Sequence, residues 1–472
     1  MASDPTPPLP SAAPLLSDYI RRPRRLGVLF KMLGIGLLIL LLHIPLVMTS
    51  GVLEERRGYK DQAAEEIAAV WGRRQLVVGP VLMVPYTYQG LVTRQRVVGD
   101  KVVQVREPES IAARAYFLPE TLTVDGDIDP DVRRRGIYES IVYLGGLTLT
   151  GEFRPDFSAL NVTAERIDWA RAQVLLSVAD LRGVRSLSPW PGGDDAPGAA
   201  FEASEIDGLP LAAKVGNAGD ATPLSFRLEL ALQGSDRLEI APVGKTTRVT
   251  LRSSWADPSF VGSFLPVRRD ISADGFTATW ETAHFSRGFA QQWTDQSTTV
   301  ENVLGSIRDA GFGVGLYLPV DAYRLVERAQ KYGVLFFVLI FAVFFLFETV
   351  AQLRIHPLQY ALAGAALCLF FLGFLALSEI VAPRWAYLTA AGACTLLVTL
   401  YGLTFLRTGR RALVIGGELA ATYAYLYFVL QAQDYALVAG AAALFVALAL
   451  VMYCTRAINW YQTDVPPRAE RV

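Results

Sequence analysis

Four ionisable residues lie within long apolar stretches of the sequence: His43, Glu348, Glu379 and Glu418. Charge is costly in hydrocarbon, so such residues usually pair with one another or line a path for ions or protons. Glu379 lies at one end of its stretch, five residues before Arg384. His43 lies in the half of the first stretch that corresponds to that end, where facing Glu379 is one possible arrangement.

Glu348 and Glu418 fall toward the opposite ends of their stretches. Both are within reach of nearby basic residues, namely Arg354, His356, Arg410 and Arg411. A relay for protons or ions needs titratable groups at the membrane midplane, whereas these candidates are split between the two ends. The pattern therefore favours structural ion pairs, and transport through Glu348 and Glu418 is the alternative.

The segment between the apolar stretches offers little catalytic chemistry. Residues 51–331 contain a single histidine, His284, and no cysteine. The sequence has no Gly-x-Ser-x-Gly elbow, no His-Glu-x-x-His zinc motif and no phosphate-binding loop of the Walker type. We therefore predict no catalytic residue, no metal site and no cofactor, and a hydrolase built on His284 is the weakest of the alternatives.

One acidic run, Asp125–Asp131, has carboxylates at alternate positions, which suits the oxygen-rich coordination of calcium. However, Pro130 stands where an EF-hand loop has glycine, and Gly136 stands where it has a bidentate glutamate. We interpret the run as a polar turn between strands.

Six apolar stretches predict six transmembrane helices, because each is near the ~20 residues that a helix needs to cross the bilayer. The first runs from Val28 to Met48, and the segment Val47–Gly51 after it is a poor cleavage site, which favours a retained signal anchor over a cleaved signal peptide. The other five are Tyr332–Val350, Leu358–Leu377, Trp385–Leu406, Ala412–Leu430 and Tyr435–Cys454.

The basic residues between these stretches predict the orientation. Arginines cluster before the first stretch and after the fourth and sixth, and such clusters favour the cytoplasm. Both termini are then cytoplasmic and residues 51–331 periplasmic. The predicted domains are a cytoplasmic Pro-rich and basic segment (1–26), transmembrane helix 1 (27–50), a periplasmic domain (51–331), a five-helix transmembrane region (332–455) and a cytoplasmic tail (456–472).

The predicted periplasmic domain begins with a helix over Val52–Trp71, where apolar residues recur at three- and four-residue spacing. Beyond it, period-2 alternation separated by Gly, Pro and Asp predicts many strands. A Pro- and Gly-rich loop at 189–198 is a possible internal boundary. The formal net charge of the chain is −1, without the basic surface of a nucleic-acid-binding protein.

Several longer segments resemble the CreD family of inner-membrane proteins, which are described as cell envelope integrity proteins. The segments that carry the resemblance are Leu76–Val81, Phe117–Leu122, Arg135–Tyr138, Asp257–Pro266, Gly275–Trp280, Asp321–Leu325, Ala329–Gly333, Phe347–Thr349, His356–Tyr360, Ala376–Glu379 and Asn459–Gln462. The resemblance implies a link to envelope stress responses and to altered tolerance of colicins and β-lactams. It supplies no catalytic residue.

These observations together predict an α+β membrane protein, with a large, mostly β, periplasmic domain inserted between the first and second of six transmembrane helices. We expect a non-enzymatic protein of the bacterial inner membrane that contributes to envelope integrity or stress response. Its partners would be the lipid bilayer and an envelope protein or cell-wall component. The sequence leaves the identity of that partner and the oligomeric state open.

Overall fold

The computed structural model describes the chain except for residues 1–23, 99–100, 161, 192–197, 217–222, 319–320, 351–354, 407, 432–435 and 457–472. The chain divides into two compact units. The helical unit comprises Met1–Arg57 and Val320–Val472, and the β unit comprises Gly58–Pro319. The transmembrane and periplasmic boundaries expected from the sequence remain predictions.

The first helix, α1, runs without interruption from Arg24 to Trp71. It joins the first apolar stretch to the helix expected over Val52–Trp71. Pro45 lies inside α1, where proline removes one backbone hydrogen-bond donor. The hydroxyl of Thr49 donates to the carbonyl of Pro45 at 3.0 Å.

Five further helices of the helical unit follow the five later apolar stretches closely, and a short helix, α3 (Ala322–Lys331), precedes them. The five are α4 (Gly333–Val350), α5 (Pro357–Ser378), α6 (Pro383–Leu406), α7 (Gly409–Gln431) and α8 (Ala436–Thr455). Among the described residues, four helices are long and apolar enough to cross a membrane, or five if α3 and α4, which are bent by 48°, form one span. The membrane-protein architecture is therefore supported, while six spans remain a prediction.

Close packing in the helical unit requires small residues at particular points. A Cβ atom on Gly364 of α5 would lie 2.1 Å from Cδ1 of Leu42 on α1. A side chain at this position would therefore require that of Leu42 to move, and small residues such as Gly364 permit close approach of helices. Large aromatic side chains fill the interior, and Phe337, Phe341 and Tyr360 are almost completely buried.

The β unit contains two sheets and a short helix, α2 (Val300–Asp309). The ten-stranded sheet consists of β1 (Gln75–Val98), β2 (Lys101–Phe117), β5 (Ala164–Ile167), β6 (Gln173–Val178), β8 (Glu202–Ala203), β9 (Leu211–Lys214), β11 (Arg237–Ile240), β13 (Pro258–Gly262), β16 (Gln292–Thr294) and β17 (Phe312–Leu316). The seven-stranded sheet has the order β14-β15-β12-β3-β4-β10-β7. Its strands are β3 (Thr121–Arg135), β4 (Tyr138–Phe153), β7 (Val184–Leu187), β10 (Leu224–Ser235), β12 (Thr246–Ser253), β14 (Arg268–Ser272) and β15 (Gly275–Ala283).

The two sheets share one hydrophobic core. Apolar side chains from both sheets, and from both sides of residues 189–198, belong to a single buried cluster. It includes Val84 and Leu175 of the ten-stranded sheet and Val124 and Trp280 of the seven-stranded sheet. The cysteine-free unit is thus stabilised by the burial of apolar surface. An internal boundary near residues 189–198 remains a prediction.

The acidic run Asp125–Asp131 lies within strand β3, so the expected turn is wrong. This run pairs along its whole length with β4. Val124 and Ile128 are buried, whereas Asp125, Asp127 and Asp129 are exposed. The alternating carboxylates therefore lie on the solvent face of a half-buried strand. Alternate residues of a strand point to the same face, and calcium-binding loops have carboxylates at the same spacing by coincidence.

Candidate functional site

Glu348 forms an ion pair with Lys31, which lies 317 residues earlier, on α1. The hydroxyl of Tyr360 donates to the second carboxylate oxygen of Glu348 at 3.3 Å. The ammonium of Lys31 also donates to the carbonyl of Ile355 at 3.2 Å. Both charges of this cluster are therefore compensated, and α1 is tied to α4 and α5. The sequence analysis named other basic residues, among them Arg354 and His356, as partners within reach of Glu348.

Glu379 lies at the carboxyl end of α5, and its side chain is mostly buried. The hydroxyl of Tyr323 on α3 donates to its Oε1 atom at 3.2 Å. The guanidinium of Arg56 on α1 lies 3.7 Å from the same oxygen. A second ion pair, from Arg57 to Glu327, joins α1 to α3. Glu379 thus joins α1, α3 and α5 through a shared carboxylate.

His43 does not take part in the cluster at Glu379. Its side chain is exposed within the helical unit, and it makes no hydrogen bond or ion pair with a residue that the structure describes. The arrangement in which His43 faces Glu379 is therefore not observed. Glu379 is instead held by groups that the sequence analysis did not connect with it.

Glu418 differs from the other two glutamates because only one of its carboxylate oxygens is engaged. Thr422, one turn further along α7, donates to Oε1 at 3.1 Å. The other oxygen, Oε2, is buried without a hydrogen-bond partner among the described residues. At ~1.5 Å per residue, Glu418 lies about 14 Å from the start of α7, near the middle of this helix.

A small apolar cavity lies next to this position. Thr422 lines it together with Tyr332, Tyr425 and Gly440, and its volume is about 30 Å³. That volume is sufficient for about one water molecule. Glu418 is thus hydrogen-bonded to a residue that borders space between α4, α7 and α8, and it is the intramembrane glutamate with the weakest compensation among those described.

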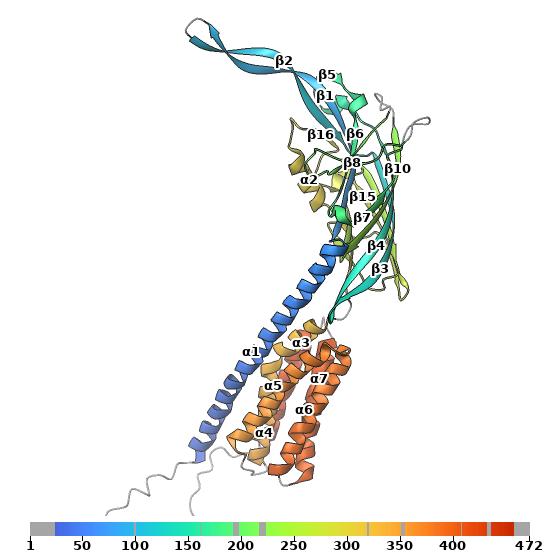
Figure 1. Ribbon diagram of the computed structural model, residues 1–472. Helices are drawn as coiled ribbons and strands as arrows, with labels where there is room; N and C mark the ends of the chain where they lie inside the picture. Colours follow the sequence, from blue (N-terminus) through green and yellow to red (C-terminus); the bar gives the residue numbers. More distant parts are fainter. Residues whose placement is uncertain are drawn as a thin grey trace, which may run out of the picture. The chain divides into compact units, whose positions relative to one another are not determined.

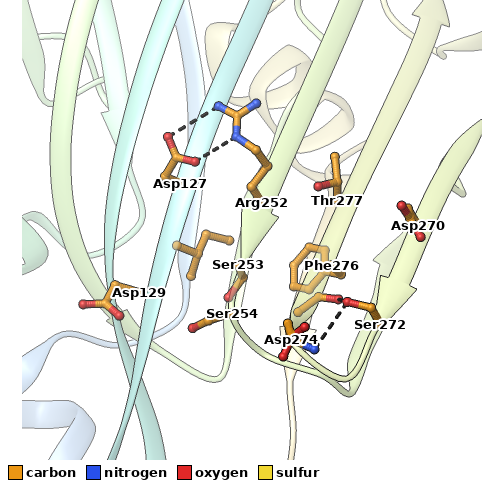
Figure 2. A pocket seen from close by; sticks show the side chains of 12 residues that line it. Asp127, Asp129, Arg252, Ser253, Ser254, Asp270, Ser272, Asp274, Phe276 and Thr277 are labelled. Carbon is orange, nitrogen blue, oxygen red and sulfur yellow. Dashed lines mark hydrogen bonds and ion pairs between the residues drawn. The ribbon is translucent and has the colours of Figure 1, made fainter.

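The β unit has a polar surface pocket of about 530 Å³ between β3, β12, β14 and β15. Figure 2 shows Asp127 and Arg252 facing each other across neighbouring strands, with Nε of Arg252 2.8 Å from Oδ1 of Asp127. The hydrogen bond from Arg252 lowers the pKa of Asp127. Ser253, Ser254 and Asp274 also line the pocket. This arrangement suits hydrogen bonding to a polar partner.

Arg287 is a buried charge that the sequence analysis did not single out. Its side chain donates to the carbonyl of Pro242 at 2.6 Å and to the amide oxygen of Gln291. The Nε atom is buried without a partner in the described part of the chain, and burial lowers the pKa of Arg287 to about 10. The nearby His284 is exposed and packs against Phe285. The burial of an arginine depends on its tertiary contacts. The local sequence therefore does not show that Arg287 is buried.

Within the described residues, no group of three or more His, Cys, Asp or Glu side chains is arranged to hold a metal ion. The pattern of the helical unit is instead one of paired charges. The chain is therefore an α+β membrane protein, which consists of an apolar helical unit with internal ion pairs and a large β unit.

The chain belongs to the CreD family. The family model described as "Inner membrane protein CreD" matches residues 27–461. The Escherichia coli (strain K12) protein named "Inner membrane protein CreD" is 31% identical over 454 residues, which cover 93% of this chain and 94% of that protein. The family resemblance noted in the sequence is therefore confirmed, and the protein is an inner-membrane protein.

A solved structure of an M1 zinc metallopeptidase from Deinococcus radiodurans is also similar in part. It matches with a TM-score of 0.21 and 11% sequence identity, covering 46% of this chain and 53% of that chain. A likeness at this level carries no argument about fold or activity.

Proposed function

We propose that this chain is a non-enzymatic protein that contributes to cell envelope integrity or to the envelope stress response. Its β unit acts as the interaction module, and its helices anchor that module in the membrane. The observation that supports this proposal is the compensation of Glu348 by Lys31 and of Glu379 by Arg56 and Tyr323. These carboxylates connect helices, as expected of an anchor.

The proposed topology has six transmembrane helices, two cytoplasmic termini and a periplasmic β unit. The distribution of arginines supports it, because basic clusters favour the cytoplasmic side. Single cysteines at Thr93 in the β unit and at Thr408 between α6 and α7, in a background without the native cysteines, test it. A membrane-impermeant maleimide applied to intact spheroplasts should label the first position and spare the second. The reverse labelling would contradict the topology.

The envelope role is tested in a strain that lacks this gene. Loss of the protein should raise sensitivity to detergent and β-lactams, and the full-length chain should restore resistance. Variants in the β unit that leave its accumulation unchanged should fail to restore it. A normal sensitivity profile in the deletion strain, together with no envelope partner after crosslinking, would contradict the proposal.

A second candidate function is transport, and the observation that favours it is the unpartnered Oε2 of Glu418 near the middle of α7. Flux measured in proteoliposomes separates the two functions. Transport predicts proton or substrate movement that is abolished by Glu418→Gln and Glu348→Gln. The anchor function predicts no flux above that of empty liposomes.

A further inference from the structure

Helix α3 differs in composition from the helix that follows it. Four of its ten residues are charged, whereas α4, which begins at Gly333, has one charged residue, Glu348, among 18. The two helices are bent by 48° relative to each other. At ~1.5 Å per residue α4 alone is about 27 Å long, close to the ~30 Å of the hydrocarbon core. We therefore expect α4 to cross the membrane without α3.

Two hydrogen bonds place α3 beside the ends of two apolar helices. The hydroxyl of Tyr323 donates at 3.2 Å to Glu379, which caps the carboxyl end of α5. The guanidinium of Arg328 donates at 3.2 Å to the carbonyl of Leu430, in the last turn of α7. Figure 1 shows α3 at this end of the helical unit. Both α5 and α7 are long and apolar enough to cross a membrane, so α3 lies at the level of the lipid headgroups.

Helix α3 has a buried face and a basic face. Its buried residues include Tyr323 and Val326, which pack into the helical unit. Arg324, Arg328 and Lys331 follow one another at spacings of four and three residues, which places them together on the opposite face. Arg324 and Lys331 are exposed. An amphipathic helix with this distribution lies in the plane of the membrane surface.

The positive charge of this basic face exceeds the negative charge of its partners. Glu327 is shared between two cations, because it pairs with Arg57 of α1 at 2.5 Å and with Lys331 at 2.9 Å. Arg328 donates to a neutral carbonyl. Arg324 has no ion pair with a residue that the structure describes. The basic face therefore has charge available for an anion.

The carboxylate at the start of α3 does not remove this excess. Asp321 precedes the helix, and its Oδ1 atom accepts a hydrogen bond from the backbone N–H of Tyr323 at 3.0 Å. It thus serves as the cap of the helix. With Asp321 and Glu327 both counted, the three basic residues still leave the segment positive.

The position of α3 determines which anion this face meets. The chain is an inner-membrane protein, so lipid surrounds the ends of its membrane helices. The anionic group of a phospholipid headgroup is its phosphate. An arginine guanidinium can donate two parallel hydrogen bonds to a phosphate, and a lysine ammonium binds it as a point charge. Basic residues at a membrane surface attract anionic lipids in particular.

We propose that the basic face of α3 binds the phosphate of an anionic phospholipid, with Arg324 and Lys331 as the contacting residues. The bound lipid holds α3 in the headgroup layer, beside the first turn of α4. This inference goes beyond the envelope role and concerns the helical unit alone. Its test therefore neither supports nor contradicts the proposed function of the β unit.

The chain offers matched variants for the test. R324Q/K331Q removes two positive charges from the basic face, and both side chains are exposed. R324K/K331R keeps the charge of the face. R268Q/R269Q is the control, because it removes the same charge from two exposed arginines of β14 in the β unit.

The experiment measures which lipids lie next to α3. A bimane fluorophore is attached to a single cysteine at Val334, an exposed position in the first turn of α4, in the full chain without its native cysteines. The protein is placed in phosphatidylcholine nanodiscs with a small fraction of phosphatidylglycerol or phosphatidylcholine that carries a nitroxide near the headgroup end of its acyl chain. The ratio of quenching by the two labelled lipids gives the preference for the anionic lipid at this position.

We expect the wild type, R324K/K331R and R268Q/R269Q to prefer labelled phosphatidylglycerol at least fivefold, the effect expected of about one basic residue at a charged membrane surface. R324Q should reduce the preference, and R324Q/K331Q should abolish it. Millimolar inorganic phosphate should leave the preference of the wild type unchanged.

Three results would overturn the proposal. They are equal quenching of the wild type by the two labelled lipids, a preference that R324Q/K331Q retains, and an equal loss of preference in R268Q/R269Q. Loss of the preference in inorganic phosphate would also contradict it, because the face would then bind a free anion. Circular dichroism of each variant verifies that the protein remains folded.

Discussion

Replacement of Lys31 by methionine should destabilise the helical unit, because it leaves the Glu348 carboxylate without its cation. Removal of one partner from a buried ion pair costs ~3–5 kcal/mol, whereas an exposed pair contributes less than ~1 kcal/mol. The side chains of Lys31 and Glu348 are 26% and 16% exposed, so the pair is intermediate. We therefore expect K31M to lower the free energy of unfolding by about 2–3 kcal/mol. E348Q should have a similar effect.

The double variant K31M/E348Q has no charge left to compensate. It should recover most of the lost stability, because the remaining amide keeps a hydrogen-bonding group beside the hydroxyl of Tyr360. The assay is denaturant-induced unfolding of the purified protein in detergent, followed by tryptophan fluorescence. A double-mutant cycle then gives the coupling energy between the two residues.

The reasoning would be refuted by additive effects of the two substitutions. A coupling energy below about 0.5 kcal/mol, the limit within which independent sites add, would show that Lys31 and Glu348 do not stabilise each other. L33M, a substitution of an exposed apolar residue on the same helix, serves as the control and should leave stability unchanged.

Three further predictions concern other charged groups. Arg287→Met should lower the free energy of unfolding by about 1–3 kcal/mol in a denaturant titration, because the carbonyl of Pro242 loses its donor; wild-type stability would contradict this. The hydrogen bond from Arg182 lowers the pKa of Asp180 to about 2 in the folded protein. The charged form of Asp180 therefore stabilises the fold at pH values above about 4, the pKa of this carboxyl in the unfolded chain. This contribution is lost as the pH falls toward 2. Asp180→Asn should therefore be less stable by about 1 kcal/mol at neutral pH, with a difference that narrows below pH 4; a difference that is constant with pH would contradict this. The Glu418→Gln variant should accumulate normally and unfold at the same or a slightly higher temperature, because the substitution removes a buried carboxylate oxygen that has no partner among the described residues. A lower melting temperature would show that the carboxylate of Glu418 makes an interaction that stabilises the protein.

The positions of the later apolar helices could be predicted from the sequence because a long apolar stretch marks each of them. The stretch Ala412–Leu430, for example, lies within α7, which runs from Gly409 to Gln431. The pairing of Lys31 with Glu348 could not be predicted, because these residues are separated by most of the chain and meet only when α1 packs against the later helices. Among the loop charges near Glu348 in sequence, Arg354 lies outside the described residues.

In the β unit, too, a local sequence pattern was not sufficient to predict the structure. Alternating acids at Asp125, Asp127 and Asp129 have the spacing of a calcium loop and also of the solvent face of a strand. Only the pairing with β4 decides between them. The full length of β1 was also not predicted, because this strand continues to Val98, beyond the last residue that pairs with β5.

The central claim is that the intramembrane carboxylates anchor the helices and that the β unit carries the envelope function. Detergent sensitivity of the deletion strain complemented with K31M/E348Q tests this claim most directly, with immunoblotting to verify equal accumulation. Our account predicts full restoration of resistance, because the double variant keeps the fold and loses only titratable groups. A normally accumulated double variant that fails to restore resistance would show that Glu348 has a role beyond structural pairing, as a proton or ion relay requires.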